Sequence, residues 1–247
     1  KLSSYYLPQF GSRNFTSIST SWGCPYKCSF CVSSTLNYRV RSAESIFKEI
    51  EYCRNLGINT FFFRDNVFGV NKTQVRELSQ MVSSANYSIS FMSDTRLDLI
   101  NDDVISYFKL MGKPALNFGI ETAKAETRDR FLKGLKTTDL HQALTKCRDN
   151  NIITTGYFIL GLEGEEEEDV KNTIDYSRRI PLDYASFNLP IPIEGTKLRD
   201  QAISRNLISA ESHNYDGSGF SFIPNENIDN LRLKKLQVMA FKLFYLR

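Results

Sequence analysis

An alternation of apolar strand-like runs with amphipathic helical segments extends over most of the sequence. Six such pairs follow one another, and each run is short and rich in β-branched or aromatic residues. The predicted strands cover residues 16–21, 60–64, 88–92, 115–120, 154–160 and 184–189. Strands that alternate with helices favour a parallel sheet covered by helices. Because six units are too few to close an eight-stranded barrel, we expect an α/β fold, an open partial (β/α)6 barrel of the TIM type.

Shorter segments are expected on either side of this barrel. The predicted division is an N-terminal lead-in at 1–14, the barrel at 15–208, and a linker with a C-terminal helical appendage at 209–247. The linker is rich in Ser, Asn, Gly and Asp. The apolar face of the terminal helix comprises Leu233, Leu236, Ala240, Leu243 and Phe244. The chain begins at Lys1 rather than at methionine and stops inside this helix, which is typical either of a piece of a longer protein or of a chain with processed ends.

The composition and charge disfavour several classes of protein. Of the 247 residues, 41% are hydrophobic and 24% are charged, which is ordinary for a globular chain with a substantial core. A formal net charge of +3 is too small to indicate nucleic acid or a membrane surface as a partner. No apolar run reaches the roughly 18 residues of a membrane span, and no signal peptide opens the chain. The cysteine usage described next favours the reducing cytoplasm.

Three of the five cysteines form a C-x3-C-x2-C array at Cys24, Cys28 and Cys31, just after the first predicted strand. A loop this short brings three thiolates to one point, which suits a metal or a cluster; a disulfide would leave one thiol over. A [4Fe–4S] cluster held by three cysteines keeps one iron open to a substrate or cofactor. A structural zinc site is the alternative, and it needs a fourth ligand. The remaining candidates show no partner spacing; they are Cys53, Cys147, His141 and His213.

The stretch around these cysteines resembles a known motif. Residues 20–31 read T-S-W-G-C-P-Y-K-C-S-F-C and look like the cluster motif of the radical S-adenosylmethionine (SAM) enzymes. Those enzymes place an aromatic residue before the third cysteine, and Phe30 fills that place. The form with G-C-P-Y and S-F-C resembles in particular the branch that carries a cobalamin-binding domain upstream. This resemblance implies a [4Fe–4S] cluster on Cys24, Cys28 and Cys31, and the shared six-unit partial barrel.

Segments that follow the second and third predicted strands extend the resemblance. Asp65 and Asn66 open a D-N-V-F stretch that looks like the family segment holding the amino group of SAM, although an Asx turn alone would explain the same residues. Arg96 follows the third strand and could form a bidentate pair with the SAM carboxylate. The alternative for Arg96 is a solvated loop charge.

The fourth and fifth predicted strands also end in family-like segments. Glu121, within G-I-E-T, resembles the residue that contacts the ribose or the amino group of SAM; its alternative role is that of an acid at a helix N-terminus. Gly161 belongs to a G-x-x-x-x-G-x-P-G-E-like stretch, in which glycine would let adenine approach the backbone. Glu163 replaces the usual proline there. The acidic run at 165–169 is expected to stabilise a helix N-terminus.

The resemblance implies a mechanism and partners. The enzyme would cleave SAM reductively to a 5′-deoxyadenosyl radical that abstracts hydrogen from a small-molecule substrate, with electrons from a reductase such as flavodoxin or ferredoxin. No D-x-H-x-x-G cobalamin loop occurs, so any cobalamin is expected on a missing N-terminal domain, where it would serve methyl transfer or ring formation. A rearrangement without cobalamin and an iron–sulfur electron-transfer module are the alternatives. A sulfur-inserting RNA modifier is disfavoured by the low net charge.

Overall fold

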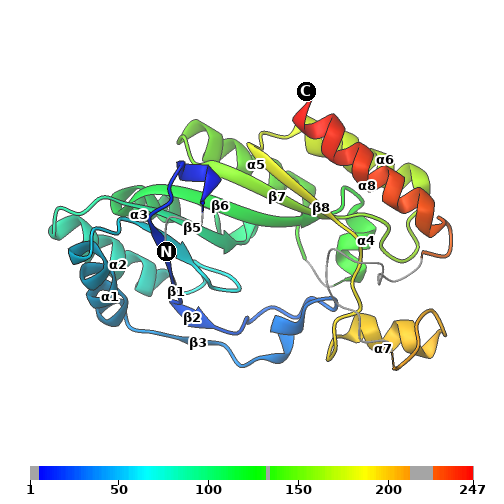
Figure 1. The fold of residues 1–247 in the computed structure, drawn as a ribbon, viewed down its shortest axis with the longest axis horizontal. Coiled ribbons are helices and arrows are strands. Elements are labelled where there is room, and N and C mark those ends of the chain that lie inside the picture. Colours follow the sequence, from blue (N-terminus) through cyan, green and yellow to red (C-terminus); the bar gives the residue numbers. More distant parts are fainter. Residues whose placement is uncertain (1–5, 132–133, 212–224, 247) are drawn as a thin grey trace. The chain divides into compact units, whose positions relative to one another are not determined.

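The computed structural model describes residues 6–131, 134–211 and 225–246 of the chain (Figure 1). The chain divides into two compact units, each built from segments that are distant in sequence. The first unit combines the residues up to Gly23 with Tyr38–Phe118 and Gln142–Thr155. The second combines Cys24–Asn37, Gly119–His141 and the residues from Gly156 onward.

The predicted α/β architecture is confirmed by one six-stranded sheet with the strand order β1-β4-β5-β6-β7-β8. Its strands are β1 (Phe15–Ile18), β4 (Thr60–Phe63), β5 (Ile89–Thr95), β6 (Gly112–Glu121), β7 (Ile153–Ile159) and β8 (Tyr184–Asn188). The β1–β4, β4–β5 and β5–β6 pairs are parallel. In the part of the chain that the structure describes, β1 and β8 do not pair with each other, so the sheet is open, as the count of six units predicts.

Several strand ends differ from the predicted ones. The first strand stops at Ile18, because Ser21–Trp22 forms β2 and pairs instead with β3 (Arg39–Val40) in a separate antiparallel ribbon. Strand β5 continues to Thr95, since its ladder with β6 runs from Ile89↔Gly112 to Thr95↔Phe118. Pairing with a neighbouring strand sets these bounds, and the sequence pattern of one strand does not contain that information.

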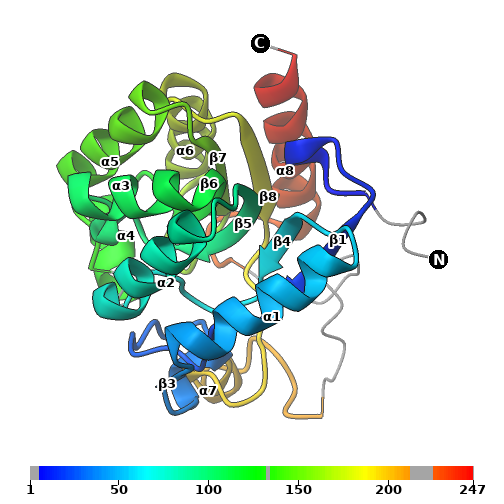
Figure 2. The same cartoon turned by 90° about the vertical axis from the view of Figure 1, so that its left-hand side faces the viewer.

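The helices of the first unit begin at predictable caps. They are α1 (Ala43–Asn55), α2 (Lys72–Ser84) and α3 (Asp102–Met111), which lie side by side in Figure 2, while α5 (Thr137–Asp149) precedes β7. Ser42, Asn71 and Asn101 each accept a hydrogen bond from the backbone N–H three residues on. Gln74, three residues after Asn71, does not complete a capping box, because its side chain donates instead to the carbonyls of Thr20 and Arg41.

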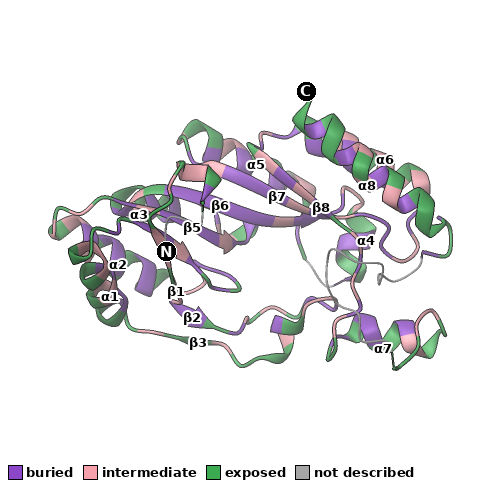
Figure 3. Cartoon of the chain, in the orientation of Figure 1, coloured by how far each residue is buried: buried purple, intermediate pink, exposed green. Residues whose placement is uncertain are grey.

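The core of the first unit is aromatic. Phe63 lies between Phe68 and Phe91, with both pairs of ring centroids 5.2 Å apart, and Phe108 of α3 stacks on Phe68 at 5.4 Å. All four side chains are fully buried. Figure 3 shows this pattern throughout, with buried strands and helices whose outer faces are exposed. Aromatic packing of this kind is worth roughly 0.5–1.5 kcal/mol per pair beyond the area buried.

The second unit contains α4 (Ala125–Arg130), α6 (Glu167–Arg179), α7 (Lys197–Ser204) and α8 (Asn230–Tyr245). The predicted apolar face of the terminal helix is confirmed for Leu233, Leu236, Ala240 and Phe244, which are buried. Leu243 was expected on that face and is 36% exposed. The predicted linker lies mostly outside the described residues.

Helix α8 covers the outer edge of the sheet's last strand. The Tyr245 hydroxyl accepts a hydrogen bond from the Ala185 N–H at 3.1 Å and donates one to the Ala185 carbonyl at 2.8 Å. Gln237 Nε2 donates to the Phe187 carbonyl at 2.8 Å. Two side chains of α8 therefore satisfy backbone groups of β8 that a further strand would otherwise pair, and the edge is protected.

Candidate functional site

The three clustered cysteines lie in one loop of the second unit, and none of the three forms a disulfide with a described residue. Cys28 is buried, whereas Cys24 and Cys31 are partly exposed. The Cys31 N–H donates to the Cys28 carbonyl at 3.2 Å, which makes a tight turn between the last two cysteines. At Ser29 the N–H donates to the Phe131 carbonyl after α4, and the carbonyl accepts from Leu198 N–H of α7. The loop is thus fixed by two helices.

The donor set fits an iron–sulfur cluster better than a single metal ion. Within the described residues, no three His, Cys, Asp or Glu side chains stand close enough to hold one ion, as the zinc alternative requires. Cluster cysteines ligate different irons, so their sulfurs lie farther apart than around one ion, and thiolates are the usual cluster ligands. Burial raises the pKa of the Cys147 thiol to about 12, as expected for a core thiol, and it also raises the pKa of the partly exposed Cys53.

Phe30, the aromatic residue before Cys31, joins the loop to the body of the second unit. Its ring lies 6.4 Å from that of Phe131, and it packs on the buried cluster that contains Leu162 and Leu198. The side chain also lines a cavity described below. Trp22, two residues before Cys24, is 54% exposed.

Asp65, in the first unit, is buried and binds the chain just before the cysteines. Its carboxylate accepts from the N–H groups of Thr20 at 2.7 Å and Ser21 at 2.9 Å, and from the Thr20 hydroxyl. Burial raises the pKa of Asp65, and these donors offset part of that rise. Asn66 beside it is exposed. The structure therefore gives Asp65 a role in fixing the backbone; contact of either residue with SAM stays a prediction.

Arg96 lies at the end of β5 and is only 7% exposed, so the alternative of a solvated loop charge is wrong. Its guanidinium makes a bidentate ion pair with Asp98, with an Nε–Oδ1 distance of 2.9 Å and an Nη2–Oδ2 distance of 2.8 Å. One edge of the guanidinium is therefore committed to Asp98. Its pairing with a SAM carboxylate stays a prediction.

Glu121 ends β6 in an unusual backbone conformation. Its φ is +68°, and the Thr122 N–H donates to the Ile120 carbonyl at 3.0 Å, so Glu121 is the central residue of a γ-turn with positive φ. The side chain is 6% exposed and lines the cavity. A non-glycine residue in this region is strained, and such strain concentrates at functional sites.

A cavity of about 410 Å³ lies within the second unit. Its walls are mostly apolar, with Phe30 and Ile159 among them, and its polar groups come from Glu121, Tyr157, Ser186 and Asn188. Tyr157 and Ile159 alternate along β7, as Ser186 and Asn188 do along β8, so each strand presents one face to it. A largely apolar pocket with a few polar groups fits a small organic molecule.

Gly161 follows β7, and because it has no side chain, Leu233 of the same chain can pack against its backbone. Its φ is +80°, and an added Cβ would stand 2.5 Å from Cδ2 of Leu233 on α8. Its N–H donates to Glu165 Oε2 at 3.1 Å. The space on the side of the missing Cβ is therefore occupied by Leu233, and the expected approach of adenine to the Gly161 backbone stays a prediction.

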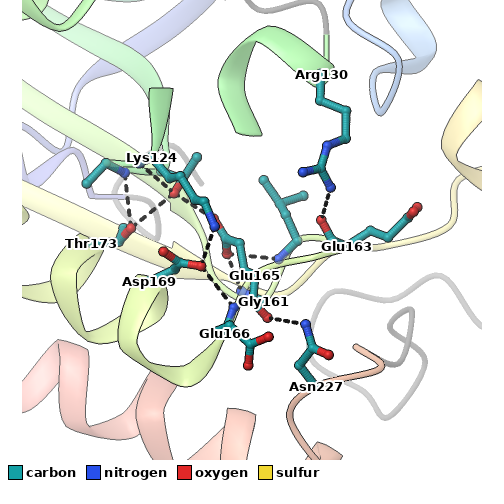
Figure 4. A network of polar contacts seen from close by, with 12 residues as sticks. Lys124, Arg130, Gly161, Glu163, Glu165, Glu166, Asp169, Thr173 and Asn227 are labelled. Atoms are coloured by element: carbon teal, nitrogen blue, oxygen red, sulfur yellow. Dashed lines mark hydrogen bonds and ion pairs between the residues drawn. The ribbon is translucent and has the colours of Figure 1, made fainter. Parts of the chain in front are cut away.

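Glu165 is a functional candidate that the sequence analysis missed. It is buried, and its carboxylate accepts from the Thr122 hydroxyl at 2.6 Å and from the N–H groups of Gly161 and Leu162 at 3.1 Å each. Burial is the largest influence on its pKa and raises it. Figure 4 shows Glu165 beside the Lys124–Asp169 ion pair of 2.6 Å. The place of Glu165 as the last residue of the G-x-x-x-x-G-x-P-G-E-like stretch is the signal that could have distinguished it from the other acids at 166–169.

Arg128 of α4 is the second missed residue, and it is fully buried. Nε donates to the Leu135 carbonyl at 3.1 Å, and the two terminal nitrogens donate to the Thr122 carbonyl at 2.5 Å and to the Thr137 hydroxyl at 2.6 Å. Burial lowers its pKa. The sequence shows it as one of several charges on a short helix, so no signal marked it.

Comparisons with known proteins agree with this arrangement. The sequence profile of the Radical SAM superfamily matches residues 18–177. An uncharacterized methyltransferase of Pyrococcus horikoshii is 28% identical over 237 residues, 94% of this chain and 52% of that protein. The anaerobic magnesium-protoporphyrin IX monomethyl ester cyclase of Rubrivivax gelatinosus is 25% identical over 175 residues, 69% of this chain and 32% of the cyclase.

A solved structure has a similar fold. It is the radical S-adenosylmethionine methyltransferase TsrM from Kitasatospora setae, with cobalamin and a [4Fe–4S] cluster bound. The TM-score is 0.69 at 18% identity, over 78% of this chain and 40% of TsrM. The chain therefore spans about half or less of each of these proteins. Among the helices that the structure describes, none has the length and apolar character needed to cross a membrane.

Proposed function

The chain belongs to the radical SAM superfamily, and we propose that it is the catalytic barrel of a radical S-adenosylmethionine enzyme. The observation that carries this proposal is the loop of three closely spaced cysteines, Cys24, Cys28 and Cys31, within the matched residues. These thiolates would hold a [4Fe–4S] cluster and leave one iron for SAM. We propose the predicted division of the chain, with the barrel at 15–208.

The proposed cleavage of SAM needs a [4Fe–4S] cluster, which the three cysteines would hold. When bound, the cluster supplies the electron that cleaves SAM to methionine and a 5′-deoxyadenosyl radical, which takes hydrogen from the substrate. The chain's own residues would bind and orient SAM. Glu121 lies at the cavity wall, where a carboxylate can accept hydrogen bonds from ribose hydroxyl or ammonium groups. Phe30 and the apolar wall would exclude water from the same space.

Methyl transfer to an unactivated carbon or phosphorus is the final reaction that we propose. It is supported by the names of relatives, which include cytidylyl-2-hydroxyethylphosphonate methyltransferase of Streptomyces wedmorensis. The cobalamin for this transfer would be bound by a domain outside this chain. Oxidative ring formation on a small-molecule substrate is the second candidate, favoured by the similarity to the cyclase of Rubrivivax gelatinosus. The electron donor would be flavodoxin or ferredoxin in the cytoplasm.

Anaerobic reconstitution with iron and sulfide, followed by reduction in the presence of SAM, tests the proposal. We expect bound iron and sulfide, and 5′-deoxyadenosine on chromatography. Both should be lost when Cys24, Cys28 and Cys31 are all changed to Ala. Cys53→Ala is the matched control, because Cys53 is a free, partly exposed thiol on α1, and it should keep both. A chain that binds the cluster and yields no 5′-deoxyadenosine would contradict the proposal and favour an electron-transfer module.

A further inference from the structure

The strain at Glu121 needs other residues to maintain it. A left-handed φ of +68° costs an L-residue free energy, and a γ-turn with positive φ is rarely adopted unless its surroundings enforce it. If the turn relaxed to negative φ, the Cα–Cβ bond of Glu121 would point in another direction. The position of the carboxylate in the cavity therefore depends on what holds the turn.

The residues that hold the turn act on Thr122, the next residue in the chain. Its carbonyl accepts a hydrogen bond from Arg128 at 2.5 Å, and its hydroxyl donates to Glu165 at 2.6 Å. The same hydroxyl lies 3.1 Å from the Thr173 hydroxyl and accepts from the Lys124 N–H at 3.2 Å. Thr122 is fully buried, so no water competes for these contacts.

The two charged groups in this arrangement are costly to bury. Arg128 makes its hydrogen bonds to neutral oxygens, two carbonyls and one hydroxyl, and Glu165 accepts from one hydroxyl and two N–H groups. Burying a charge without an opposite charge as its direct hydrogen-bond partner is unfavourable unless several hydrogen bonds compensate. Both groups direct one of those hydrogen bonds to Thr122, so the Thr122 peptide is held from its carbonyl and from its side chain.

We propose that Thr122, Arg128 and Glu165 are positioning residues that hold the Glu121 carboxylate in the cavity for contact with SAM. This inference rests on the proposed function, because it gives Glu121 the role of a SAM ligand. Arg128 and Glu165 do not touch SAM in this proposal; they act on it through Thr122 and Glu121. Removing the Thr122 hydroxyl should therefore weaken SAM binding only while Glu121 is present.

The test is equilibrium binding of SAM to the reconstituted, unreduced protein in a double-mutant cycle of Thr122→Val with Glu121→Ala. Valine matches threonine in shape and lacks the hydroxyl. We expect Thr122→Val to weaken SAM binding roughly three- to tenfold, which is equivalent to the net free energy of about one hydrogen bond. Thr122→Ser keeps the hydroxyl and should restore most of the affinity. In the Glu121→Ala background, Thr122→Val should change the affinity less than about twofold.

Thr127→Val is the matched control. Thr127 lies on α4, is fully buried, and its hydroxyl has no hydrogen-bond partner in the part of the chain that the structure describes. It should bind SAM like the wild type. Hydrogen exchange of the Thr122 amide in the protein without SAM gives a second readout, and Thr122→Val should accelerate it because the γ-turn opens more often.

The possible results distinguish a failure of the proposed SAM site from a failure of the positioning role. Wild-type protein that does not bind SAM, or Glu121→Ala that binds it unchanged, would refute the proposed SAM site and the positioning role with it. If Glu121→Ala weakens binding but Thr122→Val does not, the SAM site stands and the positioning role is refuted. The positioning role is also refuted if Thr122→Val weakens binding equally with and without Glu121, since Thr122 would then act independently of the carboxylate.

Discussion

Substitution of Gly161 by alanine separates two reasons for a glycine at this position. If the glycine only makes room for an adenine, Gly161→Ala should reduce SAM affinity. Its effect on stability should then be limited to the cost of a left-handed backbone conformation for alanine. The structure instead places Leu233 against Gly161, so the main effect should be on stability. Gly195 is the matched control, because its φ of +78° is close to the +80° of Gly161 and an added Cβ there would meet nothing within 4 Å.

The expected magnitudes follow from the two environments. A left-handed conformation costs an L-residue roughly 1–2 kcal/mol, and this is the whole cost expected for Gly195→Ala. At Gly161 the added methyl would also stand 2.5 Å and 2.9 Å from the two δ-carbons of Leu233. Leu233 is fully buried and has little freedom to move, so overpacking adds roughly 1–3 kcal/mol. Gly161→Ala should therefore lose about 2–5 kcal/mol of unfolding free energy.

Urea unfolding of the two single variants measures the difference directly. A third variant, Gly161→Ala with Leu233→Ala, should lose less stability than the sum of its single changes, because truncating the leucine removes the close approach while leaving a cavity of its own. Equal losses in Gly161→Ala and Gly195→Ala, or additive losses in the double variant, would refute the contact with Leu233 as the reason for this glycine.

Two further predictions concern Tyr245 and Glu165. Tyr245→Phe should lose about 1–2 kcal/mol in urea unfolding, because the buried Ala185 N–H and carbonyl lose their side-chain partner, while Tyr52→Phe, 66% exposed, should stay within about 0.5 kcal/mol of wild type. Burial raises the pKa of Glu165, so the folded state binds its proton more tightly. The stability that Glu165 contributes is therefore fully present below its ordinary pKa of about 4.5 and is lost as pH rises through the raised value. The wild-type advantage over Glu165→Gln should fall between pH 4.5 and 7 in urea unfolding of the protein without its cluster; an advantage that rises would mean that the three donors outweigh burial.

The sequence was sufficient for the order and type of the main elements, because apolar periodicity and helix caps are local properties. Ser42 and Asn71 cap their helices as their positions indicate, and all six strands form one sheet. Strand ends were less predictable. The stretch at 93–95 is polar and was expected to be a loop, but it extends β5 because β6 continues alongside it. A ladder depends on both strands, so one strand's sequence cannot set its length.

The same limit explains the residues that were missed. Arg128 and Glu165 are charged, and charged residues are rarely buried unless paired, so a sequence pattern places them on the surface. Their burial becomes necessary only when the end of β6, the turn after β7 and the start of α6 meet at Thr122, which is a tertiary event. The side-chain hydrogen bonds from α8 to the edge of β8 also depend on tertiary contacts, and periodicity indicated only that α8 has a buried face.

The carboxylates at the strand ends therefore divide into two kinds that the sequence cannot separate. Asp65 and Glu165 are buried, and their oxygens accept hydrogen bonds from the chain's own backbone and hydroxyl groups. These hydrogen bonds fix the backbone of the loops that they reach. Glu121 is equally buried, but it lines the cavity and occupies a strained turn that the buried groups around Thr122 maintain. A carboxylate at a cavity wall is within reach of a ligand in that cavity, and backbone strain concentrates at functional sites. On this argument, Glu121 is the strand-end acid whose removal should affect SAM binding more than folding, whereas removal of Asp65 should affect folding first.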